Sequence, residues 1–509
     1  MSDNNDHLGG DADVIVVGGG SAGAVLAARL SEDPQRHVLL IEAGPDYLAG
    51  QFPHGLQTPH LLADPDHDWG YTARGTDRAP SIPAPRGRTM GGSSSVNAGV
   101  AIRARPADFA TWADRYGIKG WSYEDVLPTF RRMENTPAGE DAHHGRSGPF
   151  PVRQWSYEEL TSPLRAFVDG STDRGFRRVD DFNGAEQEGV GGYPVNIVDG
   201  VRQNTALAYL TPQVRRRPNL QVLSEVTVDT VLIKDGVARG VVSASGTVHR
   251  AAEVLLAAGS YGSPAILLRS GVGPAKDLRA LGIDVVADLP VGRRLQDHPF
   301  FHSLFALAPE HQTMTDAFAA GLWCASAEAR VGELDLGIVA VHLLDGSFSP
   351  TGGALLLATA LTRPESRGSL TLAGGDPYDA PVINDNYLAT ARDRRRILEG
   401  VKLVRSLVNT PRFAGALAGE LVPGDAVQGD EELLATIEAG ISTYGHPTST
   451  VPMGGPEDEW AVVDELGAVK GVARLRVVDA SIMPEVPSTV TNATTIMIAE
   501  HIAHRVYGA

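Results

Sequence analysis

The sequence is poor in cysteine and in positive charge, and both shortages exclude functions. Cys324 is the only cysteine among 509 residues, which excludes an intramolecular disulfide, a Cys-x-x-Cys redox pair and a metal site made of several cysteines. Lys and Arg number 44 against 62 Asp and Glu, which gives a formal net charge of −18. Such an acidic chain is poorly suited to the phosphate backbone of a nucleic acid. We therefore expect no nucleic-acid partner.

Long hydrophobic runs are also missing. A segment that crosses a bilayer needs roughly 18 to 20 uninterrupted apolar residues, whereas the longest runs here, such as Val254 to Ala258, have the length of a strand. The N-terminal sequence MSDNNDHLGGDAD is polar and acidic and lacks the basic and apolar regions of a secretory signal. We expect a cytoplasmic protein without a membrane span.

Histidines with metal-ligand spacing are not found either. His143 and His144 are adjacent and have no spaced partner, so we expect them in a solvent-exposed loop and predict no metal site. The rest of the composition is that of a globular protein, with 42% hydrophobic and 21% charged residues. At roughly 100 to 200 residues per domain, the length predicts two or three structural units.

The first pattern along the chain is a strand, a glycine-rich turn and a helix. Asp13 to Val17 reads DVIVV, and GGGSAG (Gly18 to Gly23) separates it from the helix-forming residues 24–30. This GxGxxG turn lets backbone N–H groups approach a pyrophosphate at the positive end of a helix. A second strand, His37 to Glu42, ends in a carboxylate that can bind a ribose diol. The unit predicts a dinucleotide site but leaves NAD, NADP and FAD open, although Glu42 disfavours the 2′-phosphate of NADP.

Other patterns predict further elements. Ser122 is a suitable N-cap for a helix over Trp121 to Met133, and Asp235-Gly236 indicates a hairpin within a group of short strands from Asn219 to Gly259. Looser alternation over residues 300–390 predicts an antiparallel sheet. The chain then ends in a predicted strand and helix, at Leu475 to Val478 and Thr494 to Val506.

Several longer motifs follow one another in a fixed order. They are RGRTMGGSSSVN (Arg86 to Asn97), GSYGSPAILLRSGVG (Gly259 to Gly273), LPVGRRLQDHP (Leu289 to Pro299), YGHPTSTVPMG (Tyr444 to Gly454) and VDASIMPEVPSTVTNATTIMIAEHIA (Val478 to Ala503). Together these motifs resemble the glucose-methanol-choline (GMC) oxidoreductase family. The resemblance covers nearly the whole chain.

The resemblance implies an α/β fold with an α+β substrate part. One domain would be a Rossmann-like FAD-binding domain of the GMC type, and the other a substrate domain built on an antiparallel sheet. The expected FAD-binding domain is discontinuous and comprises residues 1–155, 196–300 and 440–509. The expected substrate-binding domain comprises residues 156–195 and 301–439.

The resemblance also implies which residues bind FAD. They are Gly18, Gly20, Ser21 and Gly23 at the pyrophosphate, Glu42 at the adenosine ribose, Val228 at the adenine through its backbone, Gly91, Gly92, Ser93 and Asn97 beside the isoalloxazine, and Asp479 and Asn492 near the pyrophosphate or the flavin. Val96 stands where some relatives carry a histidine bonded covalently to the flavin. Since valine has no nucleophile, we expect non-covalent FAD.

His446 is the expected catalytic residue, because it matches the histidine of the family's HPxGTxxMG-like motif. A base must take the hydroxyl proton of an alcohol while the α-hydrogen leaves as hydride, and imidazole suits this role near neutral pH. The chain departs from the family at two positions. Ser449 replaces a glycine, which we expect to alter only the local turn. Val490 replaces a second His or Asn and can neither accept a proton nor bind the substrate oxygen.

The missing second group leaves several readings open. His302 or His342 could assist His446, although a structural role is the simpler expectation for each, as it is for His298. The leading hypothesis is an enzyme that oxidises an alcohol to an aldehyde or ketone and passes its electrons to oxygen or another acceptor. The alternatives are a non-redox flavoprotein lyase on the same scaffold, a nicotinamide dehydrogenase, and a nucleotide-binding protein that has lost its chemistry. The sequence does not identify the alcohol.

Overall fold

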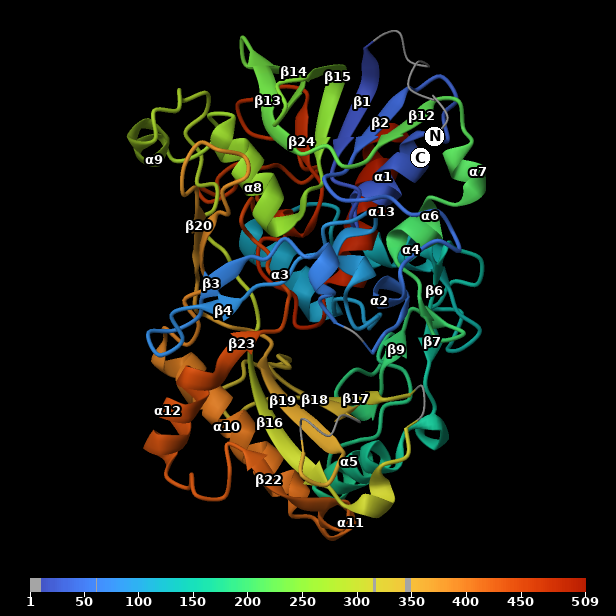
Figure 1. The fold of residues 1–509 in the computed structure, drawn as a ribbon, viewed down its shortest axis with the longest axis vertical. Coiled ribbons are helices and arrows are strands. Elements are labelled where there is room, and N and C mark those ends of the chain that lie inside the picture. The colour runs from blue at the N-terminus through green and yellow to red at the C-terminus, as the bar shows by residue number, and fades with distance from the viewer. Residues whose placement is uncertain (1–10, 61, 315–316, 344–348) are drawn as a thin grey trace.

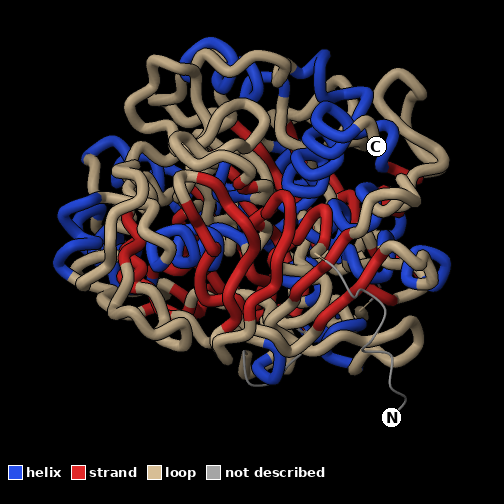
Figure 2. Tube along the Cα trace, turned by 90° about the horizontal axis from the view of Figure 1, so that it is seen from above, coloured by secondary structure: helices blue, strands red, loops and turns tan. Residues whose placement is uncertain are grey.

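The computed structural model describes residues 11–60, 62–314, 317–343 and 349–509. Two sheets lie at opposite ends of the long axis of the molecule, and helices flank both (Figure 1). The view along that axis shows strands in the interior with helices and loops around them (Figure 2). Residues 1–10, which carry most of the N-terminal sequence that argues against export, lie outside the described residues.

The predicted βαβ unit begins the first sheet. This sheet has seven strands in the order β12-β2-β1-β15-β14-β13, and β24 also pairs with β15. The pairs β1–β2, β1–β15, β2–β12 and β15–β24 are parallel, whereas β13–β14 and β14–β15 are antiparallel. The strands are β1 (Ala12–Val17), β2 (Val38–Ile41), β12 (Leu220–Leu223), β13 (Val228–Lys234), β14 (Val237–Ser243), β15 (Val248–Leu256) and β24 (Leu475–Val477). The Asp235-Gly236 hairpin prediction is confirmed, since both residues have positive φ angles between β13 and β14.

The second sheet is antiparallel throughout, as predicted. Its seven strands run in the order β22-β16-β19-β18-β17-β8, and β23 also pairs with β16. They are β8 (Gly189–Gly192), β16 (Pro299–Leu307), β17 (Ala319–Cys324), β18 (Leu336–Leu343), β19 (Ala354–Leu361), β22 (Leu417–Val422) and β23 (Ile441–Thr443). Helices α5 (Ser162–Asp173) and α10 (Ala391–Val408) pack against it. Strands β16 and β23 lie at the expected domain boundaries, and the division of the chain into two domains stays a prediction.

Smaller sheets and further helices complete the fold. The four-stranded sheet contains β20 (Ser369–Thr371), β21 (Val382–Asn384), β3 (Thr72–Arg74) and β4 (Ile82–Pro83), and strand pairs form between β5 (Glu134–Asn135) and β6 (Phe150–Pro151), β7 (Arg153–Gln154) and β9 (Pro194–Val195), and β10 (Ile197–Val198) and β11 (Val201–Arg202). The other helices are α1 (Gly23–Leu30), α2 (His54–Gln57), α3 (Pro106–Tyr116), α4 (Tyr123–Met133), α6 (Thr205–Tyr209), α7 (Pro212–Arg215), α8 (Gly259–Arg269), α9 (Ala275–Ala280), α11 (Pro411–Ala414), α12 (Asp430–Gly440) and α13 (Asn492–Tyr507).

A local sequence signal explains where helix α4 begins. Ser122 caps α4 by accepting a hydrogen bond from the N–H of Asp125, whose carboxylate accepts one from the N–H of Ser122 in return. Helix α13 starts at Asn492, two residues before the predicted start. In the described parts of the chain, no helix combines the length and apolar character that a membrane crossing requires.

The expectation of a solvent-exposed loop at His143 and His144 is wrong for His144. The ring of His144 is buried and bonds to Glu134 Oε2 at 3.0 Å and to Asp181 Oδ2 at 2.8 Å. Burial opposes the charged ring, but the hydrogen bonds to these two carboxylates outweigh it and raise the pKa of His144 to about 9. Across the described residues, no cluster of His, Cys, Asp and Glu side chains is arranged to hold a metal ion.

This ion-pair cluster predicts that the free energy of unfolding falls as the pH rises from 6.5 to 9. A histidine with a folded pKa of about 9 and an unfolded value of 6.5 contributes stability that is complete below pH 6.5 and is lost as the pH passes the folded value. His144→Gln removes the titrating group, so the decline should shrink by about 1–3 kcal/mol. Urea unfolding at several pH values measures the free energy of unfolding of the wild-type protein and of His144→Gln. Parallel pH curves for these two proteins would contradict the raised pKa of His144.

Candidate active site

A cavity of about 930 Å³ is lined by residues of both sheets and brings most of the predicted site residues together. The predicted residues that line it are Gly18, Gly20, Ser21, Glu42, Gly92, Ser93, Asn97, Val228, Asp479, Asn492 and His446. Gly23 and Gly91 do not line the cavity. They shape its wall instead, because Gly23 begins α1 and Gly91 adopts a left-handed conformation just before the 3₁₀ turn Gly92–Ser95.

The glycine turn between β1 and α1 is too tight for larger residues. A Cβ on Gly23 would lie 1.7 Å from the carbonyl oxygen of Gly18, and one on Gly92 would lie 2.7 Å from the Cα of Gly20. Gly18 has a φ of +95°, which L side chains rarely adopt. The backbone of the Gly92 loop therefore lies directly against the backbone of the turn before α1. Backbone N–H groups at the start of a helix can bind a pyrophosphate.

Two buried carboxylates hold the backbone around this cradle. Glu42 accepts hydrogen bonds from the N–H groups of Gly19 at 2.7 Å and Gly44 at 2.8 Å, and Asp479 accepts them from Gly259 N at 2.9 Å and Ser263 Oγ at 2.6 Å. Burial raises the pKa of both carboxyl groups, and these hydrogen bonds oppose the rise. Glu42 lines the cavity at the end of β2, and each of its oxygens accepts one backbone N–H group, which leaves each a further lone pair for a ribose diol.

The starts of α1 and α13 meet at the cavity through a side-chain hydrogen bond. Ser21 Oγ donates to Asn492 Oδ1 at 2.8 Å. The buried Nδ2 of Asn492 has no hydrogen-bond partner among the described residues. A donor left unpaired beside a glycine cradle and the Glu42 carboxylate fits an anionic dinucleotide such as FAD.

His446 lines the other part of the cavity, and its backbone is held in place. Its N–H donates to Asp297 Oδ1 at 2.8 Å, and the preceding carbonyl, of Gly445, accepts from the Arg86 guanidinium at 3.0 Å. The ring is buried, with 9% of the residue exposed. Burial, followed by the nearby His298 and Arg86, lowers the pKa of His446 well below 6.5, so the ring is neutral at pH 7.

His298, for which we expected a structural role, contacts His446 directly. The Nδ1 atoms of the two rings are 3.0 Å apart, and Nε2 of His298 lies 2.9 Å from the carbonyl oxygen of Pro487. The motif QDHP marked His298 in the sequence. Its contact with a residue 148 positions away was not visible there.

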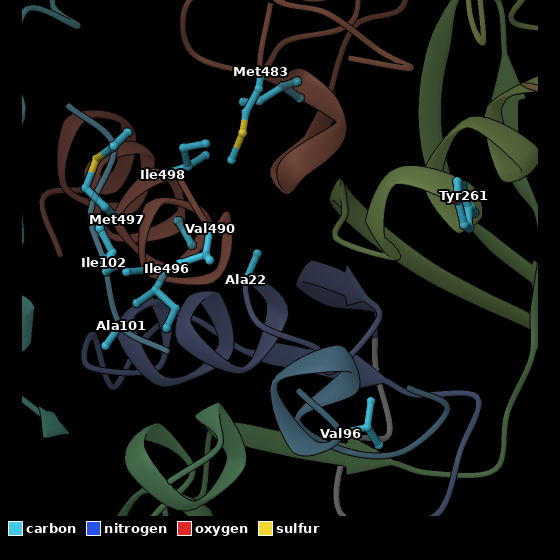
Figure 3. Close-up of a cluster of buried hydrophobic side chains, with 14 of the residues drawn as sticks. Ala22, Val96, Ala101, Ile102, Tyr261, Met483, Val490, Ile496, Met497 and Ile498 are labelled. Carbon is cyan, nitrogen blue, oxygen red and sulfur yellow. The ribbon is translucent and has the colours of Figure 1, made fainter. Parts of the chain in front are cut away.

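The departures from the family pattern have clear structural outcomes. Ser449 adopts a φ of +65°, so it takes the left-handed conformation that a glycine would favour and the turn is kept. Val490 lines the cavity, and Figure 3 shows it with Val96 among buried hydrophobic side chains. His302 and His342 both line the cavity. His302 packs edge-on against Phe300, and neither ring nitrogen of the buried His342 has a hydrogen-bond partner among the described residues. Among the described residues, the hydrogen bond to the His446 ring comes from His298 and not from either of these two rings.

The cavity wall near His446 is mainly apolar and aromatic. The ring of Tyr444 stacks on Phe300 with centroids 4.2 Å apart and lies at the same centroid distance from the His446 ring. The acidic side chains among the described lining residues are Glu42, Asp479 and the exposed Asp379. Apolar and aromatic residues of this wall are Trp155, Tyr193, Phe300, Phe318, Val339, Val341, Leu356, Tyr444 and Val490.

Comparisons with known proteins match this fold and site. The GMC oxidoreductase family matches residues 12–300 with its N-terminal part and residues 364–499 with its C-terminal part. The oxygen-dependent choline dehydrogenase of Photobacterium profundum is 34% identical to this chain, over 97% of this chain and 93% of the relative. That of Paraburkholderia phymatum is 37% identical, over 97% of this chain and 92% of the relative. The crystal structure of pyridoxine 4-oxidase from Mesorbium loti has a TM-score of 0.90 and 32% identity, over 98% of this chain and 100% of that one.

The comparisons and the dinucleotide cradle together identify a flavin-dependent oxidoreductase, in which the cradle and the buried His446 line one cavity. The chain belongs to the GMC oxidoreductase family. Its cofactor is FAD and its activity is the oxidation of an alcohol, so the nicotinamide alternative is set aside. The comparisons give no support to a lyase.

Proposed function

We propose that His446 is the base that takes the hydroxyl proton of the alcohol at its Nε2 atom. The O–H bond breaks as the Nε2–H bond forms, the carbinol C–H bond breaks with both electrons leaving on the hydrogen, and a C=O bond remains. Bound FAD supplies the acceptor for this hydride. The observation that carries the proposal is that Nε2 of the cavity-lining His446 has no hydrogen-bond partner among the described residues, while its Nδ1 and backbone N–H are both engaged.

The same proposal gives the cofactor residues their roles. Gly18, Gly20 and Ser21 bind the pyrophosphate, and Glu42 orients the adenosine ribose. Val228 lies at the adenine, Gly92, Ser93 and Asn97 lie beside the isoalloxazine, and Asn492 offers its unpaired Nδ2. Their common position in the lining of one cavity supports these roles. Asp479 acts through the backbone, because each of its oxygens already accepts two hydrogen bonds from the protein, whereas each oxygen of Glu42 accepts one.

We expect FAD to be bound without a covalent link. Val96 lines the cavity and offers no nucleophile to the flavin. Acid precipitation of the purified protein should release all of the flavin into the supernatant. Yellow colour that stays with the washed precipitate would contradict this expectation.

The proposed substrate is an uncharged alcohol with an apolar or aromatic body. A quaternary ammonium group such as that of choline binds best to free aromatic faces or beside a carboxylate. Near His446, the Tyr444 and Phe300 rings stack on each other, and the two buried carboxylates of the described lining, Glu42 and Asp479, both accept hydrogen bonds from the protein. We therefore expect aryl and aliphatic primary alcohols to be oxidised with a higher kcat/KM than choline.

An alcohol panel mixed with the enzyme without oxygen tests the proposed function. Loss of the oxidised flavin absorbance, together with one aldehyde or ketone per flavin, is the expected result. Admission of air to the reduced enzyme then distinguishes oxygen from another electron acceptor by the rate at which the absorbance returns. A flavin that stays oxidised with every alcohol would overturn the proposal.

A further inference from the structure

His298 is a buried histidine held between a backbone carbonyl and His446. Its exposed fraction is 0%. Its Nε2 lies 2.9 Å from the carbonyl oxygen of Pro487, and its Nδ1 lies 3.0 Å from Nδ1 of His446. Both ring nitrogens of His298 are therefore engaged, and neither faces the cavity.

The chemistry of these partners fixes the hydrogen on each nitrogen. A carbonyl oxygen only accepts hydrogen bonds, so Nε2 of His298 carries the hydrogen that it donates to Pro487. Burial lowers the pKa of His298 to about 4, which keeps the ring neutral and leaves its Nδ1 as an acceptor. The facing Nδ1 of His446 must then be the donor. The lone pair of the neutral His446 ring is consequently on Nε2, the nitrogen that the proposed function requires.

We propose that His298 is a positioning residue that selects the tautomer of His446 in which Nε2 is free to accept a proton, an inference that rests on the proposed function of His446. The role resembles that of a carboxylate that orients a catalytic imidazole, but here the orienting group is a neutral imidazole. After proton transfer, His298 still accepts the Nδ1–H of the His446 imidazolium. The arrangement matters more in this chain because Val490 offers no second polar group at the cavity.

Charged groups around the pair leave this arrangement intact. Asp297 accepts the backbone N–H groups of both His298 and His446 at 2.8 Å, so it fixes the two backbones and not the rings. Asp108 is the other carboxylate that acts on His298, and Arg86 is the cation that acts on His446. The backbone of Thr362 also acts on the His298 ring, while the hydrogen bond at 3.0 Å joins the two Nδ1 atoms.

Nitrogen NMR of the holoenzyme with ¹⁵N-labelled histidine tests the tautomer without any turnover. His446→Gln and His298→Asn assign the two rings by loss of their signals. At pH 7, His446 should have a protonated Nδ1 and an unprotonated Nε2, and His298 should have the reverse. A protonated Nε2 on a neutral His446 would overturn the proposal, and because no alcohol is involved, this result is independent of whether the proposed function holds.

Two substitutions at His298 separate positioning from packing. His298→Leu removes the acceptor, and flavin reduction should slow by ~10²-fold with little change in the Kd for the alcohol. His298→Asn keeps an acceptor oxygen near the Nδ1 position and should recover to within roughly tenfold of wild type. His501→Leu is the matched control, since His501 is also buried and also bonds a carbonyl through Nε2, that of Gly120 at 2.9 Å, away from the cavity.

The two variants also give outcomes that contradict the proposal. Wild-type rates in His298→Leu would show that the base needs no positioning partner. Equal losses in the Leu and Asn variants at normal FAD content would assign His298 a packing role. If the Leu variant does not fold, the NMR measurement on the wild-type enzyme still decides the tautomer.

Discussion

Flavin reduction by an alcohol should slow by ~10²-fold or more in His446→Ala, while the variant keeps its FAD. The loss follows from the geometry, because His446 Nε2 has no hydrogen-bond partner among the described residues, whereas its neighbour His298 has both ring nitrogens engaged. Val490 cannot accept a proton. Stopped-flow mixing without oxygen measures the rate constant of flavin reduction directly and separates it from reoxidation.

The pH dependence of the same rate gives a second view of His446. A protonated ring cannot accept the hydroxyl proton, and burial lowers the pKa of His446 well below 6.5. The wild-type rate should therefore stay constant through pH 6.5 and fall only at pH values well below 6.5. His504→Gln, at an exposed histidine of α13, should leave rate and pH profile unchanged.

An undiminished rate in His446→Ala would remove His446 from the mechanism.

Gly23→Ala should weaken FAD binding and lower the FAD content of the purified protein. The new Cβ would lie 1.7 Å from the Gly18 carbonyl oxygen, so the turn must open and move the backbone that lines the cavity. Overpacking of this kind costs about 1–3 kcal/mol, which corresponds to a weakening of FAD binding by roughly 5- to 150-fold. Flavin content per chain and titration of the apoprotein with FAD measure the effect.

A second glycine provides the matched control for this substitution. Gly415, after α11, has a φ of −66°, and a Cβ added there would have no atom within 4 Å, so Gly415→Ala should bind FAD normally. Circular dichroism of both variants separates loss of FAD from loss of the fold. Stoichiometric FAD with wild-type affinity in Gly23→Ala would contradict the role of the tight turn.

Features set by neighbouring residues were predictable from the sequence. The Gly18–Gly23 turn, the Asp235-Gly236 hairpin and the Ser122 cap depend on backbone conformations and hydrogen bonds a few positions apart. The antiparallel sheet also followed from alternation along its strands. The motifs then placed Glu42 and His446, which line the cavity as expected.

Contacts between distant segments were not predictable in this way. His298 meets His446 across 148 residues, and His144 meets Asp181 across 37, so no local pattern marks either pair. Motifs marked His298 and His446 separately but not their contact, and the expectation for His144 was wrong because burial beside two carboxylates decides its state. Ser449 shows the converse, since a serine keeps a turn for which the motif has a glycine.

In the proposed reaction, the carbinol hydrogen of an alcohol passes as hydride to FAD while His446 takes the hydroxyl proton. The most direct test compares flavin reduction, without oxygen, by one alcohol and by the same alcohol deuterated at the carbinol carbon. We expect loss of the oxidised flavin absorbance in both cases, distinctly slower with deuterium. Product formation with the flavin still oxidised, or equal rates for the two alcohols in both the wild-type enzyme and His446→Ala, would contradict hydride transfer to the flavin.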